Sequence, residues 1–120
     1  MHVLCLNCGS SSLKFAVYRC EDSDESEIVR GAVEGISSGQ GRLWIQRSTE
    51  QEYQECTHAC LSHSEAFEAA LKSLSVHELP AFTAIAHRVV HGGDQFDRPQ
   101  FIDPQVLGIL RSQVRFAPLH

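Results

Sequence analysis

This 120-residue chain lacks long hydrophobic runs and has few basic residues. Its apolar stretches, such as residues 84–86, are far shorter than the roughly 18 to 20 residues that a bilayer crossing needs, so we expect no membrane span. With 10 Lys and Arg against 15 Asp and Glu, the formal net charge is -5, which excludes a broad basic surface for nucleic acid or anionic lipid. Any anion that the chain binds must therefore be held by local groups.

We also expect no secretory signal, because the first residues contain neither a basic segment nor a long apolar segment, and the cytoplasm is the expected compartment. Five cysteines, an odd number, fit free thiols in a reducing compartment better than a disulfide framework. Cys5 and Cys8 are three positions apart and would point to opposite faces of an extended segment, which argues against a zinc or redox pair. Four further residues could complete such a metal site, but we discount it for the same reason (Cys56, His58, Cys60 and His63).

The first half of the chain predicts a meander of antiparallel strands. Apolar residues 3–6 end at a polar turn, and residues 13–18 then alternate between apolar and polar side chains. Five acidic residues within 21–27 indicate a solvated hairpin tip. Residues 28–33 and 42–46 predict two further strands, joined by a Ser- and Gly-rich loop.

The second half changes to a helical period. Ser62 and Glu65 form a capping box ahead of apolar residues spaced by three and four, which predicts a helix over 63–76. Residues 82–90 predict an apolar strand. Asp103, followed by a proline, predicts the N-cap of a second helix. The expected order is β-β-β-(β)-α-β-α in a single domain, with no internal repeat.

The turn between the first two strands has the chemistry of an anion site. Gly9 lets backbone N–H groups approach a ligand, three serine hydroxyls add donors, and Lys14 lies two residues beyond Ser12 on the same strand face. The Walker A spacing is absent, and the turn leads into a strand, so no helix dipole contributes. Local chemistry leaves two alternatives of equal weight, a phosphate site and an ordinary Ser-rich hairpin.

A second stretch, residues 86–93, places Arg88 at the end of an apolar strand, where it could bind a carboxylate or phosphate with two hydrogen bonds. A pair of glycines follows and permits close approach to the backbone. His87 and His91 are four residues apart and share one strand face, but two histidines make a weak case for a metal. We favour histidines at the edge of the core that bond to backbone groups.

Three motifs in this order resemble the acetate kinase (acetokinase) family: residues 6–15 (LNCGSSSLKF), residues 87–93 (HRVVHGG) and residues 117–120 (APLH). The similarity extends from about residue 3 to residue 120 and corresponds to the N-terminal portion of the family. The resemblance implies an α/β fold, more narrowly an α+β mixed sheet, of the actin-like, ribonuclease-H-like ATPase class, in which a hairpin meander is followed by β/α units.

The resemblance also implies reversible, Mg²⁺-dependent phosphoryl transfer from ATP to acetate, which gives acetyl phosphate and ADP. Matching the motifs residue by residue places the metal-bound phosphates at Asn7 and the phosphate and ATP contacts at Ser10, Ser12 and Lys14. The same matching places the acetate carboxylate or acyl phosphate at Arg88, and the walls of the pocket for the acetate methyl group at Val90 and Leu119.

In the family, the catalytic Asp, the transition-state His, a second Arg, the adenosine pocket and a metal-binding Glu lie beyond the position of His120. We therefore expect a truncated N-terminal domain over residues 1–120, without its C-terminal domain and inactive alone, because phosphoryl transfer needs several charged groups at once. The full-length family implies a homodimer. The alternatives are a propionate kinase, or a non-catalytic phosphate-binding domain from an incomplete gene product.

Overall fold

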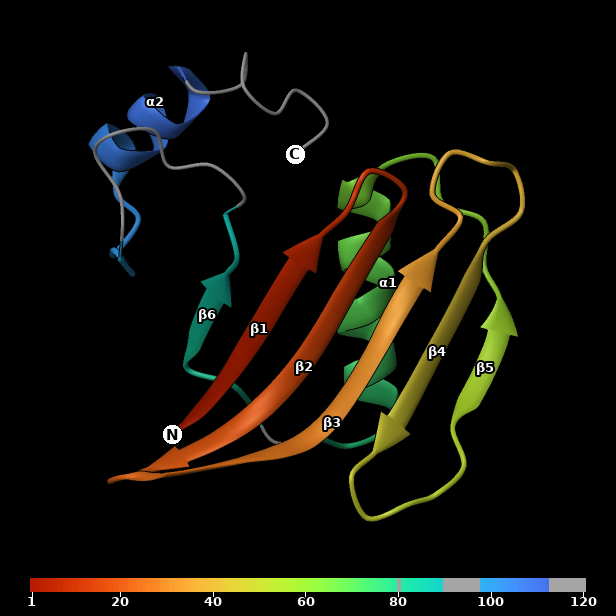
Figure 1. Cartoon of the computed structure of the whole chain (residues 1–120). Coiled ribbons are helices and arrows are strands. Elements are labelled where there is room, and N and C mark those ends of the chain that lie inside the picture. The colour runs from red at the N-terminus through yellow and green to blue at the C-terminus, as the bar shows by residue number, and fades with distance from the viewer. Residues whose placement is uncertain (80, 90–97, 113–120) are drawn as a thin grey trace. The chain divides into compact units, whose positions relative to one another are not determined.

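The structure, a computed structural model, describes residues 1–79, 81–89 and 98–112 and divides into two compact units, residues 1–88 and 89–120 (Figure 1). Within these described ranges, the first unit holds a six-stranded sheet and one helix, and the second holds one helix. The elements in chain order are β1 (His2–Cys8), β2 (Ser12–Glu21), β3 (Asp24–Glu34), β4 (Arg42–Arg47), β5 (Gln54–Thr57), α1 (His63–Val76), β6 (Ala84–His87) and α2 (Pro104–Ser112). Neither helix of the described residues has the length and apolar character required to cross a bilayer.

The sheet has the strand order β5-β4-β3-β2-β1-β6 (Figure 1). Strands β1 to β4 form the antiparallel meander that the sequence predicts, and β5 extends it. Strand β6 pairs in parallel with β1 at the far edge. The register places Asn7 opposite Lys14 and Leu6 beside His87. The parallel pairing therefore brings the end of β6 to the end of β1, next to the Ser-rich turn.

Strand β5 is the element that the sequence analysis missed, because all four of its residues are exposed and none follows an apolar alternation. Its pairing with β4 is accompanied by an ion pair, in which Arg42 Nε lies 2.5 Å from Glu55 Oε2. Strand β6 covers only Ala84–His87 and is shorter than the predicted 82–90, of which Val90 is outside the described residues. The acidic hairpin tip is exposed over residues 21–26, as expected.

Helix α1 begins and ends where the capping pattern predicts. The Glu65 N–H donates to Ser62 Oγ at 3.2 Å, while the Leu61 N–H donates to Glu65 Oε2 at 2.5 Å. The first bond satisfies an amide group that the first turn of a helix leaves free, and the second ties the residue before the N-cap to the helix. In α1 the buried residues are mostly small, which allows close packing against the sheet (Ala66, Ala69, Ala70 and Leu74).

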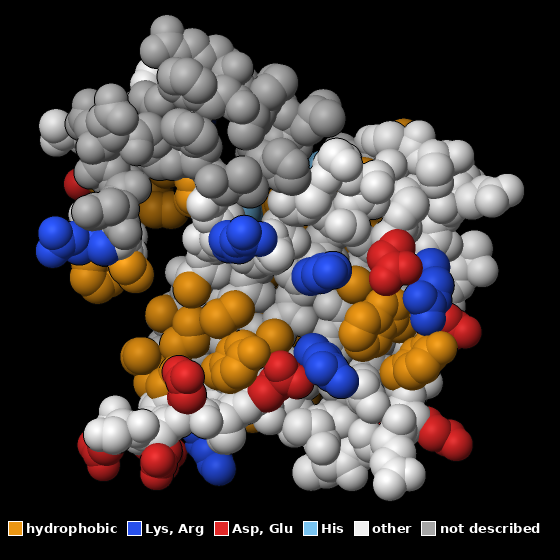
Figure 2. Space-filling view, in the orientation of Figure 1, with side chains coloured by type: hydrophobic (Ala, Val, Ile, Leu, Met, Phe, Trp, Pro, Cys, Tyr) orange, Lys and Arg blue, Asp and Glu red, His pale blue; other side chains and the backbone are white. Residues whose placement is uncertain are grey.

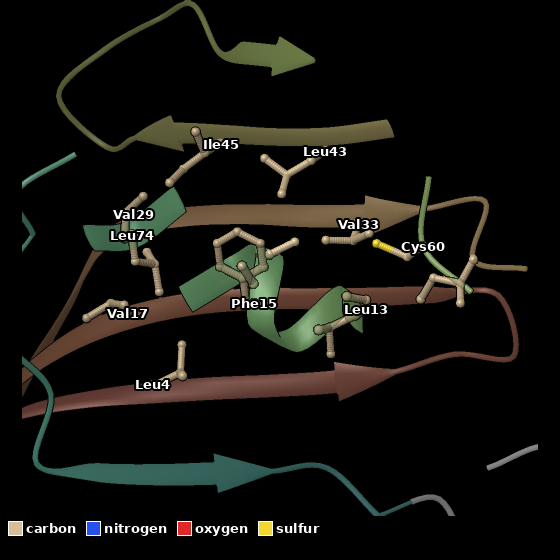
Figure 3. Packing of buried hydrophobic residues seen from close by; sticks show 14 residues of the cluster. Leu4, Leu13, Phe15, Val17, Val29, Val33, Leu43, Ile45, Cys60 and Leu74 are labelled. Atoms are coloured by element: carbon tan, nitrogen blue, oxygen red, sulfur yellow. The ribbon is translucent and has the colours of Figure 1, made fainter. Parts of the chain in front are cut away.

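The core lies between α1 and one face of the sheet (Figure 3). Leu13, Phe15 and Val17 alternate inward along β2 and are at most 3% exposed. The Phe15 ring lies over Gly31 of β3, where any Cβ would collide with the ring and with the Trp44 carbonyl oxygen of β4. A glycine is thus required at this point of the sheet, since the aromatic ring fills the space of its missing side chain.

The opposite face of the sheet carries no helix among the described residues of the first unit (Figure 1). Figure 2 shows this face, with Lys and Arg side chains spread among hydrophobic patches and acidic side chains gathered near the tip of the β2–β3 hairpin. We refer to it as the open face.

The second unit is described over residues 98–112 and contains α2. The Asp103 Oδ1 atom accepts a hydrogen bond from the Val106 N–H at 2.8 Å, and Pro104 is the first helical residue. Both features were predicted from the sequence, because an aspartate N-cap and a proline at the first position suit a helix start.

Candidate functional site

The Ser-rich turn consists of three residues, 9–11, between β1 and β2. The Gly9 N–H donates to the Ser12 carbonyl oxygen at 2.9 Å and closes the turn. The Ile36 N–H donates to the Ser11 carbonyl oxygen at 2.9 Å, and His63 Nε2 lies 2.7 Å from the Gly9 carbonyl oxygen. Contacts from the turn itself, from the residues after β3 and from α1 therefore hold its backbone in place.

A side chain at Gly9 would interfere with the hydroxyl of Ser12, because an added Cβ would lie 2.8 Å from Ser12 Oγ. Ser12 is half-buried at the start of β2, while Ser10 is exposed at the tip of the turn. Glycine at position 9 thus leaves room for the Ser12 hydroxyl close to the turn backbone.

Asn7 and Lys14 form a cross-strand pair on the open face. They are direct partners in the β1–β2 register, and Leu4 and Leu13, at opposite strand parity, are buried on the α1 side. Directly opposed residues in an antiparallel pair have Cβ atoms about 4.5 to 5.5 Å apart. Ser12 lies two residues before Lys14 in the same strand and shares its face.

Arg88 follows the last residue of β6, and its N–H donates to the Leu6 carbonyl oxygen at 3.0 Å. Ala86 is the register partner of Cys5 on β1, so Arg88, two residues later, has the strand parity of Asn7. The parallel strand therefore places Arg88 beside Asn7 on the open face, although the two residues are far apart in the sequence. We call Asn7, Ser12, Lys14 and Arg88 the open-face cluster.

The side chains of this cluster make no hydrogen bond or ion pair with any residue that the structure describes. Two other arginines of the sheet have acidic partners: Arg30 pairs with Glu27, and Arg42 pairs with Glu34 and Glu55. Within the described ranges, therefore, no carboxylate pairs with either cation of the cluster. Their charges are available to an anion, and the Arg88 guanidinium can bind a carboxylate or phosphate with two parallel hydrogen bonds.

On the α1 side of the same strand ends, Cys8 and His87 lie together. His87 Nδ1 is 2.6 Å from the Arg88 carbonyl oxygen, and its Nε2 is 3.3 Å from Cys8 Sγ. A carbonyl only accepts, so Nδ1 carries the proton and Nε2 accepts from the thiol. Burial raises the pKa of the Cys8 thiol, which favours this neutral donor. His87 therefore bonds to a backbone group, as the sequence analysis favours, but it is exposed and does not pack at the edge of the core.

The family resemblance assigns seven residues to substrates, and five of them lie in or next to the Ser-rich turn and the adjoining strand ends: Asn7, Ser10, Ser12, Lys14 and Arg88. Val90 and Leu119, expected to line a methyl pocket, lie outside the described residues, as does His91. Cys5 and Cys8 are three residues apart in β1 and so face opposite sides of the sheet, as their spacing predicts.

His63 is a contact of the turn that the sequence analysis did not identify, since it considered this residue only as a metal ligand. Among the residues described, no three His, Cys, Asp or Glu side chains gather around a point where a metal ion could sit. From the capping box, the sequence indicates that His63 is the first residue of α1. Only the fold shows that the helix starts beneath the turn, because the two segments are far apart in the chain.

Comparison with known proteins places these features in one family. A sequence model of the acetokinase family matches residues 2–120. An acetate kinase from Syntrophobacter fumaroxidans is 34% identical over 128 residues, which cover 100% of this chain and 31% of the relative. One from Streptomyces avermitilis is 38% identical over 122 residues, 98% of this chain and 30% of the relative.

Solved structures agree with the sequence comparison. The crystal structure of Porphyromonas gingivalis acetate kinase matches with a TM-score of 0.87 at 29% identity, over 99% of this chain and 31% of that chain. A propionate kinase from Francisella tularensis matches with a TM-score of 0.84 at 31% identity, over 99% and 30%. The expected fold class is confirmed: the mixed sheet with α1 on one face is the N-terminal part of an actin-like ATPase fold. The chain spans about 30% of the length of the curated relatives it matches, and it belongs to the acetokinase family.

Proposed function

We propose that this chain is the substrate-side part of an acetate kinase, which transfers the γ-phosphoryl group of ATP reversibly to acetate. The observation that carries the proposal is the open-face cluster, where Lys14 and Arg88 lie on neighbouring segments beside Asn7 without carboxylate partners among the described residues. A carboxylate and a phosphate bound side by side need two cationic groups in this arrangement.

In this reaction a carboxylate oxygen of acetate attacks the γ-phosphorus of ATP. The bond between that phosphorus and the bridging oxygen breaks, and ADP leaves with the electron pair. Arg88 holds and orients the carboxylate, while Lys14 and the hydroxyls of Ser10 and Ser12 hold the phosphoryl oxygens. Charge stabilisation and alignment are what phosphoryl transfer requires from a protein, so these residues contribute binding and orientation.

The amide oxygen of Asn7 fits one coordination position of a magnesium ion, a hard cation that prefers oxygen ligands. Among the described residues, no group of three His, Cys, Asp or Glu side chains could hold a metal ion by itself. Magnesium commonly keeps several waters and binds substrate phosphates, so one protein oxygen at this position is compatible with a metal carried by the nucleotide. When bound, the ion would neutralise charge on the phosphates of ATP.

The remaining catalytic groups are proposed to come from a C-terminal domain, because the relatives are about three times as long as the matched region. The isolated chain is then inactive, and the complete protein is proposed to be a cytoplasmic homodimer. Propionate kinase is the second candidate, favoured by the structural match to the Francisella tularensis protein. The two substrates differ by one methylene group, which an apolar pocket distinguishes by about 1 to 3 kcal/mol.

The test replaces the matched first third of the Syntrophobacter fumaroxidans acetate kinase by this chain and measures acyl phosphate formation from ATP with acetate and with propionate. We expect activity in the chimera and none in the isolated chain. Arg88→Ala should reduce kcat/KM for the carboxylate by at least about a hundredfold, because a charge-assisted contact is lost, and Arg88→Lys should recover part of it. An Arg88→Ala chimera with unchanged carboxylate kinetics would remove Arg88 from the site.

A further inference from the structure

We infer that His63 is a positioning residue that orients the peptide between Gly9 and Ser10, so that the Ser10 N–H is presented to a phosphoryl oxygen. The inference rests on the proposed function for the identity of the ligand, and on the geometry of the turn for everything else. His63 itself touches the turn and is not proposed to contact substrate.

The contact joins α1 to the turn through a single imidazole nitrogen. His63 Nε2 lies 2.7 Å from the Gly9 carbonyl oxygen, and because a carbonyl oxygen only accepts, Nε2 is the protonated nitrogen. His63 is the first residue of α1, directly after the N-cap Ser62, whose hydroxyl is bonded to the helix backbone. The ring is therefore carried by a fixed helix end, and it pulls the Gly9 carbonyl toward α1.

A trans peptide is planar and its C=O and N–H point in opposite directions. None of the described peptide bonds is cis, so an oxygen held toward α1 directs the Ser10 N–H away from the helix. Ser10 lies outside both strands, and its N–H donates to no group in the part of the chain that the structure describes. The His63 contact thus leaves one amide donor free on the side of the turn away from α1.

Without His63 the orientation of this peptide would be poorly determined. Glycine permits backbone angles that other residues avoid, so the peptide that follows Gly9 can turn over at low cost. The turned peptide would present a carbonyl oxygen, with partial negative charge, in place of the N–H. The change replaces an N–H that donates to an anion by a carbonyl oxygen that repels it. The charge of Lys14 is the same in both peptide orientations, so it does not replace the lost hydrogen bond.

The experiment compares the wild-type chain with His63→Ala, His63→Gln and a matched control, His77→Ala. Glutamine carries an N–H donor at about the reach of Nε2, whereas alanine carries none. His77 caps the other end of α1, where its ring bonds to Ser73 and Gln54, so its removal disturbs the same helix and leaves the turn contact intact.

The first measurement needs no ligand. In ¹H–¹⁵N spectra of the free chain we expect the Ser10 amide signal to shift and broaden in His63→Ala, to return toward the wild-type position in His63→Gln, and to stay in place in His77→Ala. Long-range ¹⁵N spectra of the wild-type ring should show a proton on Nε2. A Ser10 signal unchanged in His63→Ala, or a ring protonated only on Nδ1, would overturn the inference.

The second measurement is calorimetric titration of each chain with acetyl phosphate. We expect binding to be about two- to tenfold weaker in His63→Ala, which is the range for one lost hydrogen bond, and near wild type in both His63→Gln and His77→Ala. Equal affinities of wild type and His63→Ala would refute the claim that the Ser10 N–H held in place by His63 binds a phosphoryl oxygen. Absence of binding by the wild-type chain would contradict the proposed function, and the ligand-free spectra would still decide the role of His63. If His63→Ala fails to fold, His63→Gln with wild-type spectra supports the inference, and a displaced Ser10 signal in this variant contradicts it.

Discussion

Replacing Gly31 by alanine should destabilise the sheet more than an ordinary surface substitution does. The added Cβ would lie 2.5 Å from Phe15 Cζ, whereas ordinary contacts begin at 3.4 Å, so the ring would have to move by about 1 Å. Phe15 is only 3% exposed and belongs to the buried core cluster, so a displaced ring would push against packed neighbours. The second obstacle, the Trp44 carbonyl oxygen, is main chain of the paired strand β4, and its displacement would disturb the β3–β4 pairing.

Inserting one methylene-sized group into a packed core costs about 1 to 3 kcal/mol, and an obstacle that belongs to the backbone places Gly31→Ala at the upper end, about 3 kcal/mol. With a denaturant slope of about 1.5 kcal/mol per molar urea, the unfolding midpoint should fall by about 2 M. The chain has one tryptophan, Trp44, on β4 beside the substitution, so its fluorescence reports directly on this region.

Gly39→Ala is the matched control for this prediction. Gly39 has a φ of +79° and no heavy atom within 4 Å of an added Cβ, so alanine there meets backbone strain alone, about 1 kcal/mol. If Gly31→Ala lowered the free energy of unfolding by no more than Gly39→Ala, the close packing of Phe15 on Gly31 would be refuted as the reason for this glycine.

Three further predictions concern charge, thiol chemistry and the second helix. In the chimera with the Syntrophobacter fumaroxidans enzyme, Lys14→Ala should weaken binding of Mg-ATP about ten- to a hundredfold in calorimetric titration, because a charge-assisted contact is lost. Glu25→Ala, on the exposed hairpin, should change the affinity little, and equal affinities of both variants would contradict a phosphate role for the turn. Burial raises the pKa of the Cys8 thiol, so the folded state is more stable with this thiol protonated. This stabilisation is fully present when the pH lies below the ordinary pKa of a thiol, and it is lost as the pH rises through the raised pKa of the folded state. At pH 8 a disulfide reagent should therefore label the exposed Cys56 well before Cys8, and equally fast labelling would show that Cys8 is not protected. Gly108→Ala should stabilise α2 by about 0.5 to 1 kcal/mol, because no atom lies within 4 Å of the added methyl group; an unchanged or lower helical signal in far-UV circular dichroism would contradict this.

Most of the fold could be predicted because local signals agree with the final packing. The capping box Ser62–Glu65 and the spacing of apolar residues locate α1, and alternation along β2 locates its buried face. Strand β5 could not be found in this way, because its residues are all exposed and its conformation depends on pairing with β4. An edge strand of this kind is defined by its neighbour and carries little pattern of its own.

The candidate site was only partly predictable for a related reason. The residue types of the turn, with Lys14 on the adjoining strand, fit an anion site, but local sequence alone leaves an ordinary Ser-rich hairpin equally open. The sequence cannot show that Arg88 lies beside Asn7, since their proximity depends on the parallel pairing of β1 and β6. The role of His63 likewise depends on where α1 lies relative to the turn, a relation between segments that share no local pattern.

The parallel pairing of β1 with β6 makes the assembly of the site depend on folding order. Strands β1 to β5 pair with their neighbours in sequence, whereas β6 must close a loop that includes nearly the whole first unit, and such long-range pairings form late. Strand β6 is four exposed residues long at an edge, so it is also the part of the sheet that should open most readily. Opening separates Arg88 from Lys14 and leaves the hairpin and the core in place. A ligand such as acetyl phosphate, which carries an acyl group and a phosphate in one molecule, would bridge the two residues and slow amide hydrogen exchange selectively in β6.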